Sequence, residues 1–349
     1  MNSDIGGQVA VTGIGPISTL GIGAKELAAA PTVTGAVGEA PAGQRRTREL
    51  DGFHPAEFLG RRGWRLLPRA TQLALAAARL ALPGPDAMGA PARERTGVAL
   101  GTNFAVDEIV DRIDRALLEE GVSGISPVEC PNFAINVPVS QISLSYGLKA
   151  FNVTLVNLLT AGYESVLLGA RAMLAGRADA VLTGGIEGLP PAGAGALCGP
   201  DADVAGACLL HLEPAGAALR RGAVVHGRLT GGARRVLPRA PRDAERVLGA
   251  VLDRLGDPPP AAIRLHVPLT GAGERTAEAG ARWAALHGVP DAVTVVRGGA
   301  QAGVTGLLAL AQHLARPAAA EGAGDVAFLT LGPQGHLVAL RVTREGGTG

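Results

Sequence analysis

Between residues 151 and 187 the spacing of apolar positions changes from that of a strand to that of a helix and back. Residues 152–158 are mostly apolar and partly β-branched, which predicts a buried strand. The small residues 160–162 interrupt this run, and apolar residues at helical spacing then predict a helix over residues 163–175. Residues 178–183 predict a second strand, which ends in two glycines. The segment therefore predicts a strand, a tight turn, a helix and a further strand.

The same patterns predict the elements on either side of this segment. Residues 8–17 predict a buried strand that runs into glycines, and residues 96–104 contain a strand that ends in Gly101. Residues 106–120 predict a helix with charged residues on its outer face. Further along, a proline-rich connection precedes a strand that ends at His266. Strands and helices therefore alternate along the chain.

The composition of the 349 residues argues against several classes of function. Hydrophobic residues make up 47% and charged residues 18%, as in a globular protein with a large core. The net charge of +1 argues against nucleic acid and anionic membranes as partners, and 3% aromatic residues leave few platforms for bases to stack on. No apolar run approaches the roughly 18 residues of a membrane span, and no signal segment is recognisable. We therefore expect a cytoplasmic protein.

Motifs for the common metals and cofactors are missing from the sequence. Cys130, Cys198 and Cys208 have neither the spacing of a metal site nor the pattern of a disulfide framework. The glycines of residues 12–15 lack the G-K-[ST] of a phosphate loop and the rest of a dinucleotide fingerprint. The sequence also contains no H-E-x-x-H, C-x-x-C or G-x-S-x-G. We therefore expect no metal and no cofactor.

The segment 151–187 resembles the nucleophile segment of the β-ketoacyl synthases, which belong to the thiolase superfamily. In that family a strand leads into a turn of the type T-A-C-A-S-G and a helix, and the next strand ends in G-G-x-E. Gly162 matches the turn glycine and residues 184–187 match G-G-x-E, so that Leu159 stands at the position of the nucleophilic cysteine. The opening strand resembles the family's V-x-V-T-G-x-G, and residues 127–145 resemble its segment at the dimer interface.

Leu159 decides what the resemblance implies for the chemistry. A cysteine at the head of a helix has a thiolate that the helix dipole stabilises, and it can carry an acyl chain as a thioester. A leucine side chain has no lone pair with which to attack, and no cysteine lies nearby in the sequence. The resemblance therefore implies a pseudoenzyme that forms no acyl-enzyme by itself.

The other catalytic positions of the family are also degenerate. Ketosynthases use two histidines for oxyanion-type stabilisation of the thioester carbonyl and the enolate. His266 stands at the position of the first histidine, in H-V-P-L-T where the family has H-G-T-x-T. Arg297 and Ala292 stand where the second histidine and its lysine are expected, and the gating phenylalanine is absent from residues 331–336. By itself, His266 is better explained as a hydrogen-bonded interior histidine than as a catalyst.

The resemblance implies the α/β fold of the thiolases, which has a five-layer αβαβα architecture and two related halves. We place the N-terminal half in residues 1–189 and the C-terminal half in residues 190–349. The second half is shortened, because the long loop that follows G-G-x-E in the family is reduced here to a short stretch rich in Pro, Ala and Gly. No similarity between the two halves is visible in the sequence.

A ketosynthase-like chain with emptied catalytic positions resembles the chain-length factor of type II polyketide synthases. In that family the non-catalytic subunit forms a heterodimer with an active ketosynthase, and the growing chain extends across the interface into it. Chain-length factors of aromatic polyketides usually carry glutamine at the position of Leu159, so the leucine is closer to partners in systems that make polyene or other highly reduced chains. Two alternatives stay open: a thiolase-fold acyltransferase or decarboxylase that uses His266, and a homodimer that binds acyl carrier protein.

By the same resemblance, the acyl tunnel of such a heterodimer is lined by residues of the nucleophile turn, by the end of an earlier strand and by the interface segment. The candidate tunnel residues are Phe104, Cys130, Asn132, Phe133, Ala134, Leu158 and Leu159.

The interface is expected to bury residues 130–141 and 151–158. Its apolar contributors would include Val137, Val139 and Leu155. The basic residues Arg61 and Arg62 are either a solvated helix start or part of a docking face for acyl carrier protein.

Overall fold

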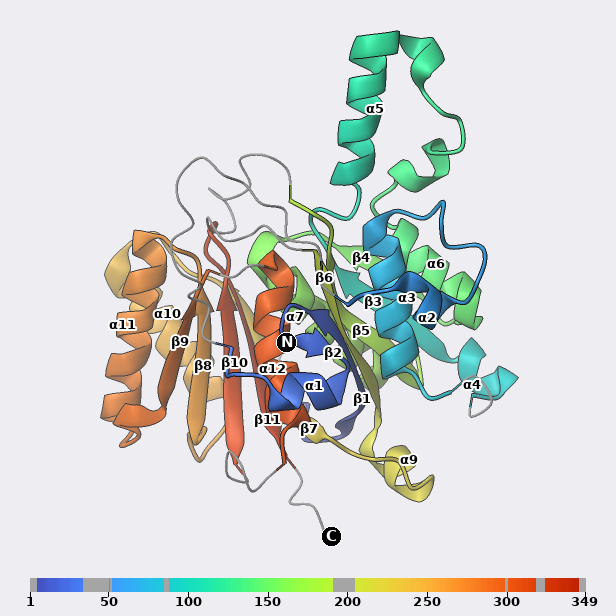
Figure 1. Cartoon of the computed structure of the whole chain (residues 1–349). Helices are drawn as coiled ribbons and strands as arrows, with labels where there is room; N and C mark the ends of the chain where they lie inside the picture. Colours follow the sequence, from blue (N-terminus) through green and yellow to red (C-terminus); the bar gives the residue numbers. More distant parts are fainter. Residues whose placement is uncertain are drawn as a thin grey trace.

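The computed structural model describes residues 5–33, 50, 52–84, 88–190, 205–298, 301–317 and 324–344. Within these residues two sets of strands and helices follow one another along the chain (Figure 1). The first set consists of β1 (Val9–Ser18), β2 (Gly21–Ile22), α1 (Ala24–Ala29), α2 (Pro55–Leu59), α3 (Arg69–Ala81), α4 (Ala90–Glu94), β3 (Thr96–Gly101), α5 (Asp107–Glu120), the 3₁₀ helices η2 (Val122–Gly124) and η3 (Cys130–Phe133), α6 (Val137–Tyr146), β4 (Asn152–Leu155), η4 (Leu158–Thr160), α7 (Ala161–Leu174), β5 (Ala180–Glu187), β6 (Gly206–Pro214) and α9 (Ala215–Arg220). The second set consists of β7 (Gly227–Val236), α10 (Pro241–Arg254), β8 (Ala262–Val267), α11 (Gly271–Leu286), η5 (Pro290–Ala292), β9 (Val293–Arg297), η6 (Ala302–Val304), α12 (Thr305–Ala315), β10 (Asp325–Leu331) and β11 (His336–Thr343).

The strands of the two sets have the same order and the same directions. In the first set the order is β4-β3-β5-β6-β1, with parallel pairs up to β5 and antiparallel pairs from there on. In the second set the order is β9-β8-β10-β11-β7, with parallel and antiparallel pairs in the same places. A short pairing of β1 with β7 joins the two sets into one 11-stranded sheet. The chain therefore contains two repeats of one topology, and the expected division after Leu189 falls between β5 and β6 of the first repeat.

Three hydrophobic cores lie between the layers of the molecule. The inner core surrounds α7 and α12, where Val166, Leu307 and Phe328 are fully buried. A second core packs α3 and α6 against the first half of the sheet, and a third packs α10 and α11 against the second half. The layers are thus α3/α6, sheet, α7/α12, sheet and α10/α11 (Figure 1). This arrangement confirms the five-layer αβαβα fold.

The glycines of residues 12–15 serve the packing of α3. A Cβ atom on Gly13 would lie 1.8 Å from the carbonyl oxygen of Ala81, and one on Gly15 would lie 2.1 Å from that of Ala77. Because β1 has no side chains at these positions, the alanine-rich helix can lie directly on the strand. The glycine pattern that suggests a phosphate loop is therefore explained by helix–sheet contact.

The predicted elements around residues 151–187 are confirmed with shifted ends. β4 is shorter than the predicted strand 152–158, because the chain turns after Leu155. Helix α7 begins at Ala161, two residues before the prediction, and β5 continues through the two glycines to Glu187. Among the described residues, no helix has both the length and the apolar character needed to cross a membrane.

Two features distinguish the β4 end of the sheet. Among the strands of the described residues β4 has a neighbour on one side only, and its own residues range from half-buried to exposed. Helix α5 extends away from the body of the protein on the same side, and among its residues only Ile109 is buried (Figure 1). An unpaired strand edge and an extended helix are both typical of surfaces that a partner covers.

Candidate functional site

The elbow, which we define as residues 156–161, carries the chain from β4 into α7. Leu158 has a φ of 37°, a backbone conformation that costs a residue with a side chain about 1–3 kcal/mol. Leu159 follows at the head of the helix and is only 1% exposed. The first N–H groups of a helix have no partner within the helix, so a nucleophile at this position would meet free donors. The elbow holds a buried leucine side chain there instead.

The strained backbone at Leu158 is held by two polar side chains from neighbouring strands. Asn103 Nδ2 donates to the carbonyl oxygen of Leu158 at 2.9 Å and to Glu187 Oε1 at 2.6 Å. Glu187 Oε2 also accepts from the backbone N–H groups of Asn103 and Phe104, at 2.9 and 3.1 Å. Burial raises the pKa of Glu187 to about 7, although these hydrogen bonds oppose the rise. The hydrogen bonds of Asn103 and Glu187 thus fix the backbone geometry of the elbow.

A small apolar cluster fills the space around Leu159. Its buried members are Phe104, Leu159 and Ala302, and the half-buried Leu158 packs against them. Close backbone contact supports this packing, because a Cβ atom on Gly101 would lie 2.2 Å from the carbonyl carbon of Ala161. Three of the predicted tunnel residues, Phe104, Leu158 and Leu159, are therefore in one place.

His266 lies on the sheet beside the elbow, and the chain itself occupies both of its ring nitrogens. Nε2 is 2.7 Å from the carbonyl oxygen of Gly298, which can only accept, so Nε2 carries the proton. Nδ1 is then an acceptor and faces the hydroxyl of Thr330 at 3.2 Å. Burial lowers the pKa of His266 to about 4, so the ring is neutral near pH 7. The hydroxyl also lies 3.4 Å from the carbonyl oxygen of Leu159, and its single proton goes either to this oxygen or to Nδ1, so Thr330 stands between His266 and the elbow.

Arg297 lies on the other face of the sheet from His266. Arg297 is paired with Val267 in the parallel register of β8 and β9, so their side chains point to the same face. Val267 belongs to the core under α10 and α11, and Arg297 makes a bidentate ion pair with Glu274 of α11, at 2.8 and 3.0 Å. His266 faces the elbow instead. Arg297 therefore does not stand beside His266, although it is the match for the second histidine in the sequence.

A second polar cluster covers the start of α7. Glu164 Oε1 accepts from Asn157 Nδ2 at 2.5 Å and from the hydroxyl of Thr160 at 3.0 Å. The guanidinium of Arg234, on β7, lies 3.3 Å from the same oxygen. A carboxylate in the first turn of a helix is also favoured by the helix dipole. The side chains of Asn157 and Thr160 are thus bound within the chain.

The predicted tunnel residues of the interface segment lie apart from the cluster around Leu159. Cys130 and Ala134 are exposed, and Phe133 is 52% exposed. Asn132 is buried, and its Nδ2 donates to the carbonyl oxygen of Leu66 at 3.2 Å. None of the four belongs to the cluster of Phe104 and Leu159. Within a single chain, therefore, the structure divides the seven candidate residues into two groups.

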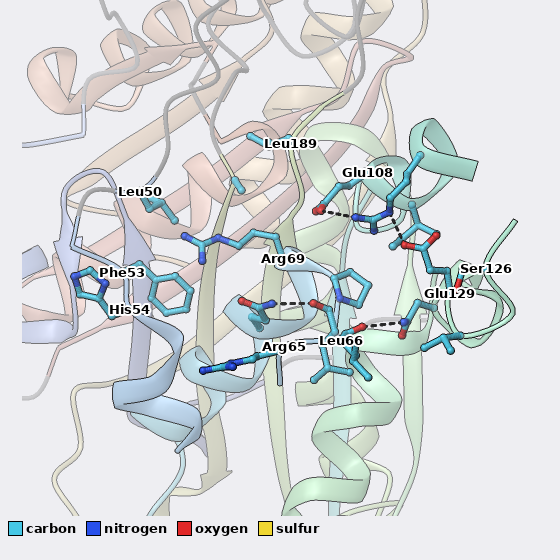
Figure 2. Close-up of a pocket in the computed structure, with 18 of the residues that line it drawn as sticks. Leu50, Phe53, His54, Arg65, Leu66, Arg69, Glu108, Ser126, Glu129 and Leu189 are labelled. Carbon is cyan, nitrogen blue, oxygen red and sulfur yellow. Dashed lines mark hydrogen bonds and ion pairs between the residues drawn. The ribbon is translucent and has the colours of Figure 1, made fainter. Parts of the chain in front are cut away.

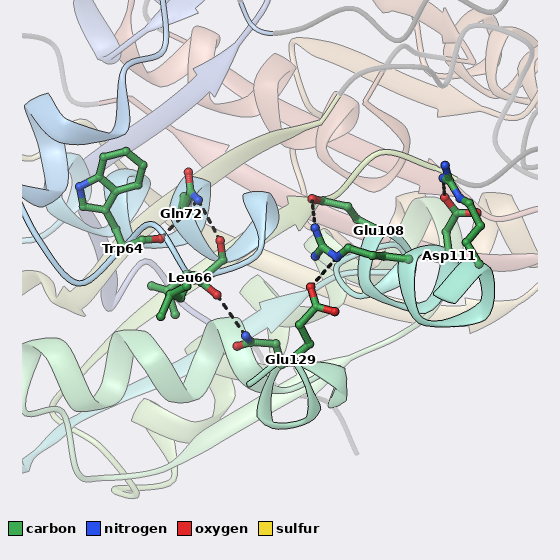
Figure 3. Close-up of polar contacts among 10 residues, drawn as sticks. Trp64, Leu66, Gln72, Glu108, Asp111 and Glu129 are labelled. Atoms are coloured by element: carbon green, nitrogen blue, oxygen red, sulfur yellow. Dashed lines mark hydrogen bonds and ion pairs between the residues drawn. The ribbon is translucent and has the colours of Figure 1, made fainter. Parts of the chain in front are cut away.

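Asn132 lines a cavity of about 1110 Å³ at the base of α5 (Figure 2). Arg65 and Arg69 lie on one side of this cavity, and Glu108 and Glu129 lie on the other. Figure 3 shows the polar contacts on the acidic side, where Arg112 contacts Glu129 Oε1 at 2.5 Å and Glu108 Oε1 at 3.8 Å. The cavity is thus lined by charged and polar groups as well as apolar ones, unlike the apolar cluster around Leu159.

Residues 8–199 match the family model of the β-ketoacyl synthase N-terminal domain. The chain belongs to the β-ketoacyl synthase family. Among curated proteins, 3-oxoacyl-[acyl-carrier-protein] synthase 2 of Vibrio cholerae serotype O1 is 31% identical over 93 residues, which are 27% of this chain and 22% of that protein. The synthase of the same name from Coxiella burnetii is 29% identical over 192 residues, or 52% of this chain and 45% of that protein. The chain spans less than half the length of these relatives.

Solved structures of ketosynthases have the same fold. The ishigamide ketosynthase/chain length factor superposes with a TM-score of 0.75 at 22% identity, over 97% of this chain and 100% of that chain. The AntDE:AntF complex, a type II acyl carrier protein with its ketosynthase, gives a TM-score of 0.75 at 19% identity over 99% and 100%. A β-ketoacyl synthase from Burkholderia phymatum gives 0.71 at 18% identity over 99% and 100%.

Two residues that form hydrogen bonds with the elbow were not recognised as site residues from the sequence. Asn103 and Thr330 contact the elbow from 55 and 171 residues away. The sequence offers one indication of their role. Each is a polar residue near the carboxyl end of a parallel strand, which is the edge of the sheet where such sites form. Glu187 was visible as the end of G-G-x-E, but its contact with Asn103 was not.

Proposed function

We propose that this chain is a non-catalytic, ketosynthase-like subunit of the chain-length-factor type. It would form a heterodimer with an active ketosynthase and shape the tunnel that receives the acyl or polyketide chain. The observation that carries this proposal is Leu159. This side chain is buried at the head of α7, at the position of the family's nucleophile, and packs against Phe104.

The surroundings of His266 argue against a catalyst of altered chemistry. A general base needs a ring nitrogen within reach of the substrate proton. Gly298 and Thr330 occupy both nitrogens of His266, and burial keeps the ring neutral. An acyltransferase or decarboxylase that uses His266 would have to break these contacts first.

The exposed surface near β4 supports the proposed partner. In the described part of the chain, seven large hydrophobic side chains between residues 117 and 156 are exposed: Leu117, Leu118, Val122, Val128, Phe133, Leu144 and Val156. Exposed apolar side chains in this number, near the β4 edge, are typical of a surface that a partner covers. Val139 was expected to contribute, but it is fully buried in the chain's own core against α3, so that expectation was wrong.

The tunnel would run from the partner's cysteine toward the cluster around Leu159. Phe104, Leu158 and Leu159 would form the wall on this chain's side. The segment 130–134 would cap the tunnel of the partner. In this arrangement its four candidate residues, Cys130, Asn132, Phe133 and Ala134, need not lie near the elbow of their own chain. The exposed Arg61 and Arg62 are available to an acidic acyl carrier protein.

Co-expression with a ketosynthase that has an intact T-A-C-A-S-G segment tests this proposal. We expect the two chains to elute together from a size-exclusion column in a one-to-one ratio. After incubation with acyl-loaded carrier protein, intact-mass spectrometry should find the acyl group on the partner and none on this chain. A monodisperse monomer at micromolar concentration, or a hydroxylamine-sensitive adduct on this chain, would refute it.

Leu144→Glu and Leu286→Glu form a matched pair of surface variants that tests the position of the interface. Both leucines are highly exposed, at 76% and 85%, but Leu144 lies on α6 next to the β4 edge and Leu286 ends α11 at the other side of the molecule. A charge buried in an apolar interface is strongly unfavourable. We therefore expect Leu144→Glu to weaken co-elution and Leu286→Glu to leave it unchanged.

A further inference from the structure

A second cavity, of about 620 Å³, lies on the side of the molecule away from β4. We call it the α10/α11 groove, and its lining residues fall within 237–248, 272–282 and 331–335. Helices α10 and α11 form its sides, and the turn between β10 and β11 closes one end. Its volume is within the range of pockets that bind small molecules. All of its walls belong to this chain, so the groove does not depend on a partner subunit.

The groove has an apolar floor and a cationic rim. Leu237, Leu248 and Leu331 are each less than 10% exposed and form the floor together with other small apolar residues. Arg239 and Arg275 lie on the rim and are exposed. Among the residues that the structure describes, neither guanidinium has a hydrogen bond or an ion pair. A floor and rim of this kind suit a molecule with an apolar body and an anionic end.

The acidic side chains of the groove do not oppose such a ligand. Glu245 is held by Arg282, whose Nε lies 2.8 Å from Glu245 Oε1, and Glu278 lies 3.9 Å from the same guanidinium. Arg282 offsets one of these two carboxylates, and the three arginines of the lining outnumber its two glutamates, so the groove keeps a positive balance with Arg239 and Arg275 left for an anion. A guanidinium binds carboxylate or phosphate oxygens with two parallel hydrogen bonds, which are stronger than neutral ones.

The walls of the groove are fixed before a ligand arrives. The turn is tied to the start of the α10 segment by a hydrogen bond from Leu237 N to the carbonyl oxygen of Gly335 at 2.8 Å. Pro238, Pro241 and Pro333 stand on the rim, and proline rings restrict the backbone. A preformed pocket loses less conformational entropy on binding.

We propose that the α10/α11 groove binds an amphipathic anion, with its acyl chain on the leucine floor and its carboxylate or phosphate between Arg239 and Arg275. The turn that closes the groove follows β10, whose Thr330 hydroxyl lies 3.4 Å from the carbonyl oxygen of Leu159 in the elbow.

Calorimetric titration of the purified protein with three ten-carbon probes tests this proposal. We expect saturable binding of sodium decanoate and decyl phosphate, and binding of decanol that is about tenfold weaker, because the loss of a charge-assisted hydrogen bond costs at least this factor. Preference for decanoate over decyl phosphate would point to a free acyl carboxylate, and the reverse preference to a phosphorylated ligand. Equal binding of all three probes, or no saturation with any of them, would overturn the proposal.

Three variants locate the site. The double variant Arg239→Gln/Arg275→Gln should weaken decanoate by at least about tenfold and leave decanol unchanged. Ala244→Trp, which fills the groove from α10, should weaken all three probes. Arg242→Gln is the matched control, because Arg242 is an exposed arginine on the same helix that does not line the groove. Wild-type affinity in the double variant, or an equal loss in Arg242→Gln, would place the binding elsewhere and refute the assignment.

Discussion

Asn103 and Glu187 form a buried pair, with Asn103 Nδ2 2.6 Å from Glu187 Oε1, and this pair supports the elbow. The amide has two N–H groups, and the second donates to the carbonyl oxygen of Leu158 at 2.9 Å. The strained backbone at Leu158 is thus tied to the ends of β3 and β5. The pair contacts the backbone of the turn through the Leu158 carbonyl oxygen, so it serves the shape of the elbow.

Asn103→Ala should therefore destabilise the fold and release the elbow. The change leaves the Leu158 carbonyl and one carboxylate oxygen without this donor in a buried place, which costs about 1–3 kcal/mol for each group. We expect urea unfolding to show a lower midpoint and a free energy of unfolding that is smaller by roughly 2–6 kcal/mol. Asn136→Ala is the control, since the side chain of this exposed residue makes no capping hydrogen bond at α6 and its loss should change the midpoint little.

Glu187 should make the protein less stable as the pH rises from about 4.5 to about 7. Burial raises the pKa of Glu187 from 4.5 to about 7, so between these values the folded chain binds more protons than the unfolded chain. The free energy of unfolding therefore falls as the pH rises, by at most ~1.4 kcal/mol per pH unit. The buried histidines add an opposite slope in both proteins, so the test is the difference: between pH 4.5 and 7 the stability of the wild type relative to Glu187→Gln should fall as the pH rises. A parallel slope in both proteins would contradict this assignment.

His266 should produce the opposite slope at lower pH. Burial lowers the pKa of His266 from 6.5 to about 4, so the unfolded chain binds the additional proton between these values. Stability should therefore decrease as the pH falls from 6.5 toward 4. Burial lowers the pKa of His211 in the same way, so His266→Asn should remove part of this slope and keep the rest. An unchanged slope in this variant would mean that His266 is protonated in the folded protein.

The period of the apolar residues was sufficient to predict the segment from β4 to β5, because its strands and helix are buried on regular faces. The position of Leu159 at the elbow followed from the spacing to Gly162. The contacts of Asn103, His266 and Thr330 could not be predicted, since they join residues between 32 and 171 positions apart. Such contacts depend on the order of strands in the sheet, which the sequence pattern does not contain.

The interpretation of Arg297 shows a second limit of the sequence. A motif match fixes the position of a residue along the chain but not the face of the sheet to which its side chain points. A shift of one residue along a strand exchanges the two faces. The register of β8 and β9 places Arg297 with Val267, toward Glu274, so only the structure separates it from His266.

Leu159→Cys should not turn this chain into a ketosynthase. The new thiol would stand at the head of α7, but both ring nitrogens of His266 already face groups of the chain. Arg297, which the sequence comparison aligns with the second histidine, is paired with Glu274 instead. Without oxyanion stabilisation a condensation loses about two to three orders of magnitude in rate per missing donor. We expect intact-mass spectrometry to detect at most slow acylation, with no condensation product above background. An intact ketosynthase is the positive control, and condensation by the variant would refute this account of the site.

Phe104 should limit the length of the chain that the proposed heterodimer makes. Phe104 is 7% exposed and packs on Leu159, and in the proposed heterodimer it would form the end of the tunnel. Forcing a methylene into such a packed wall costs about 1–3 kcal/mol, and each ~1.4 kcal/mol changes the partition between extension and release about tenfold. Phe104→Ala should therefore give products longer by one or more extension units, as read by mass spectrometry of the reconstituted pair.

Two further variants show whether this effect belongs to the tunnel. Phe133→Ala removes the ring that would cap the partner's tunnel, and it should lengthen products if the exposed segment inserts there. Phe58→Ala removes a half-buried ring that packs in a tilted arrangement against Phe53, in the α2–α3 region, and should leave product length unchanged. Because a buried Phe→Ala change costs about 3–5 kcal/mol of stability, co-elution of the heterodimer must be verified for each variant. Products of normal length and yield from both Phe104→Ala and Phe133→Ala would leave the two rings as packing residues, and the wall that sets chain length would then lie outside them.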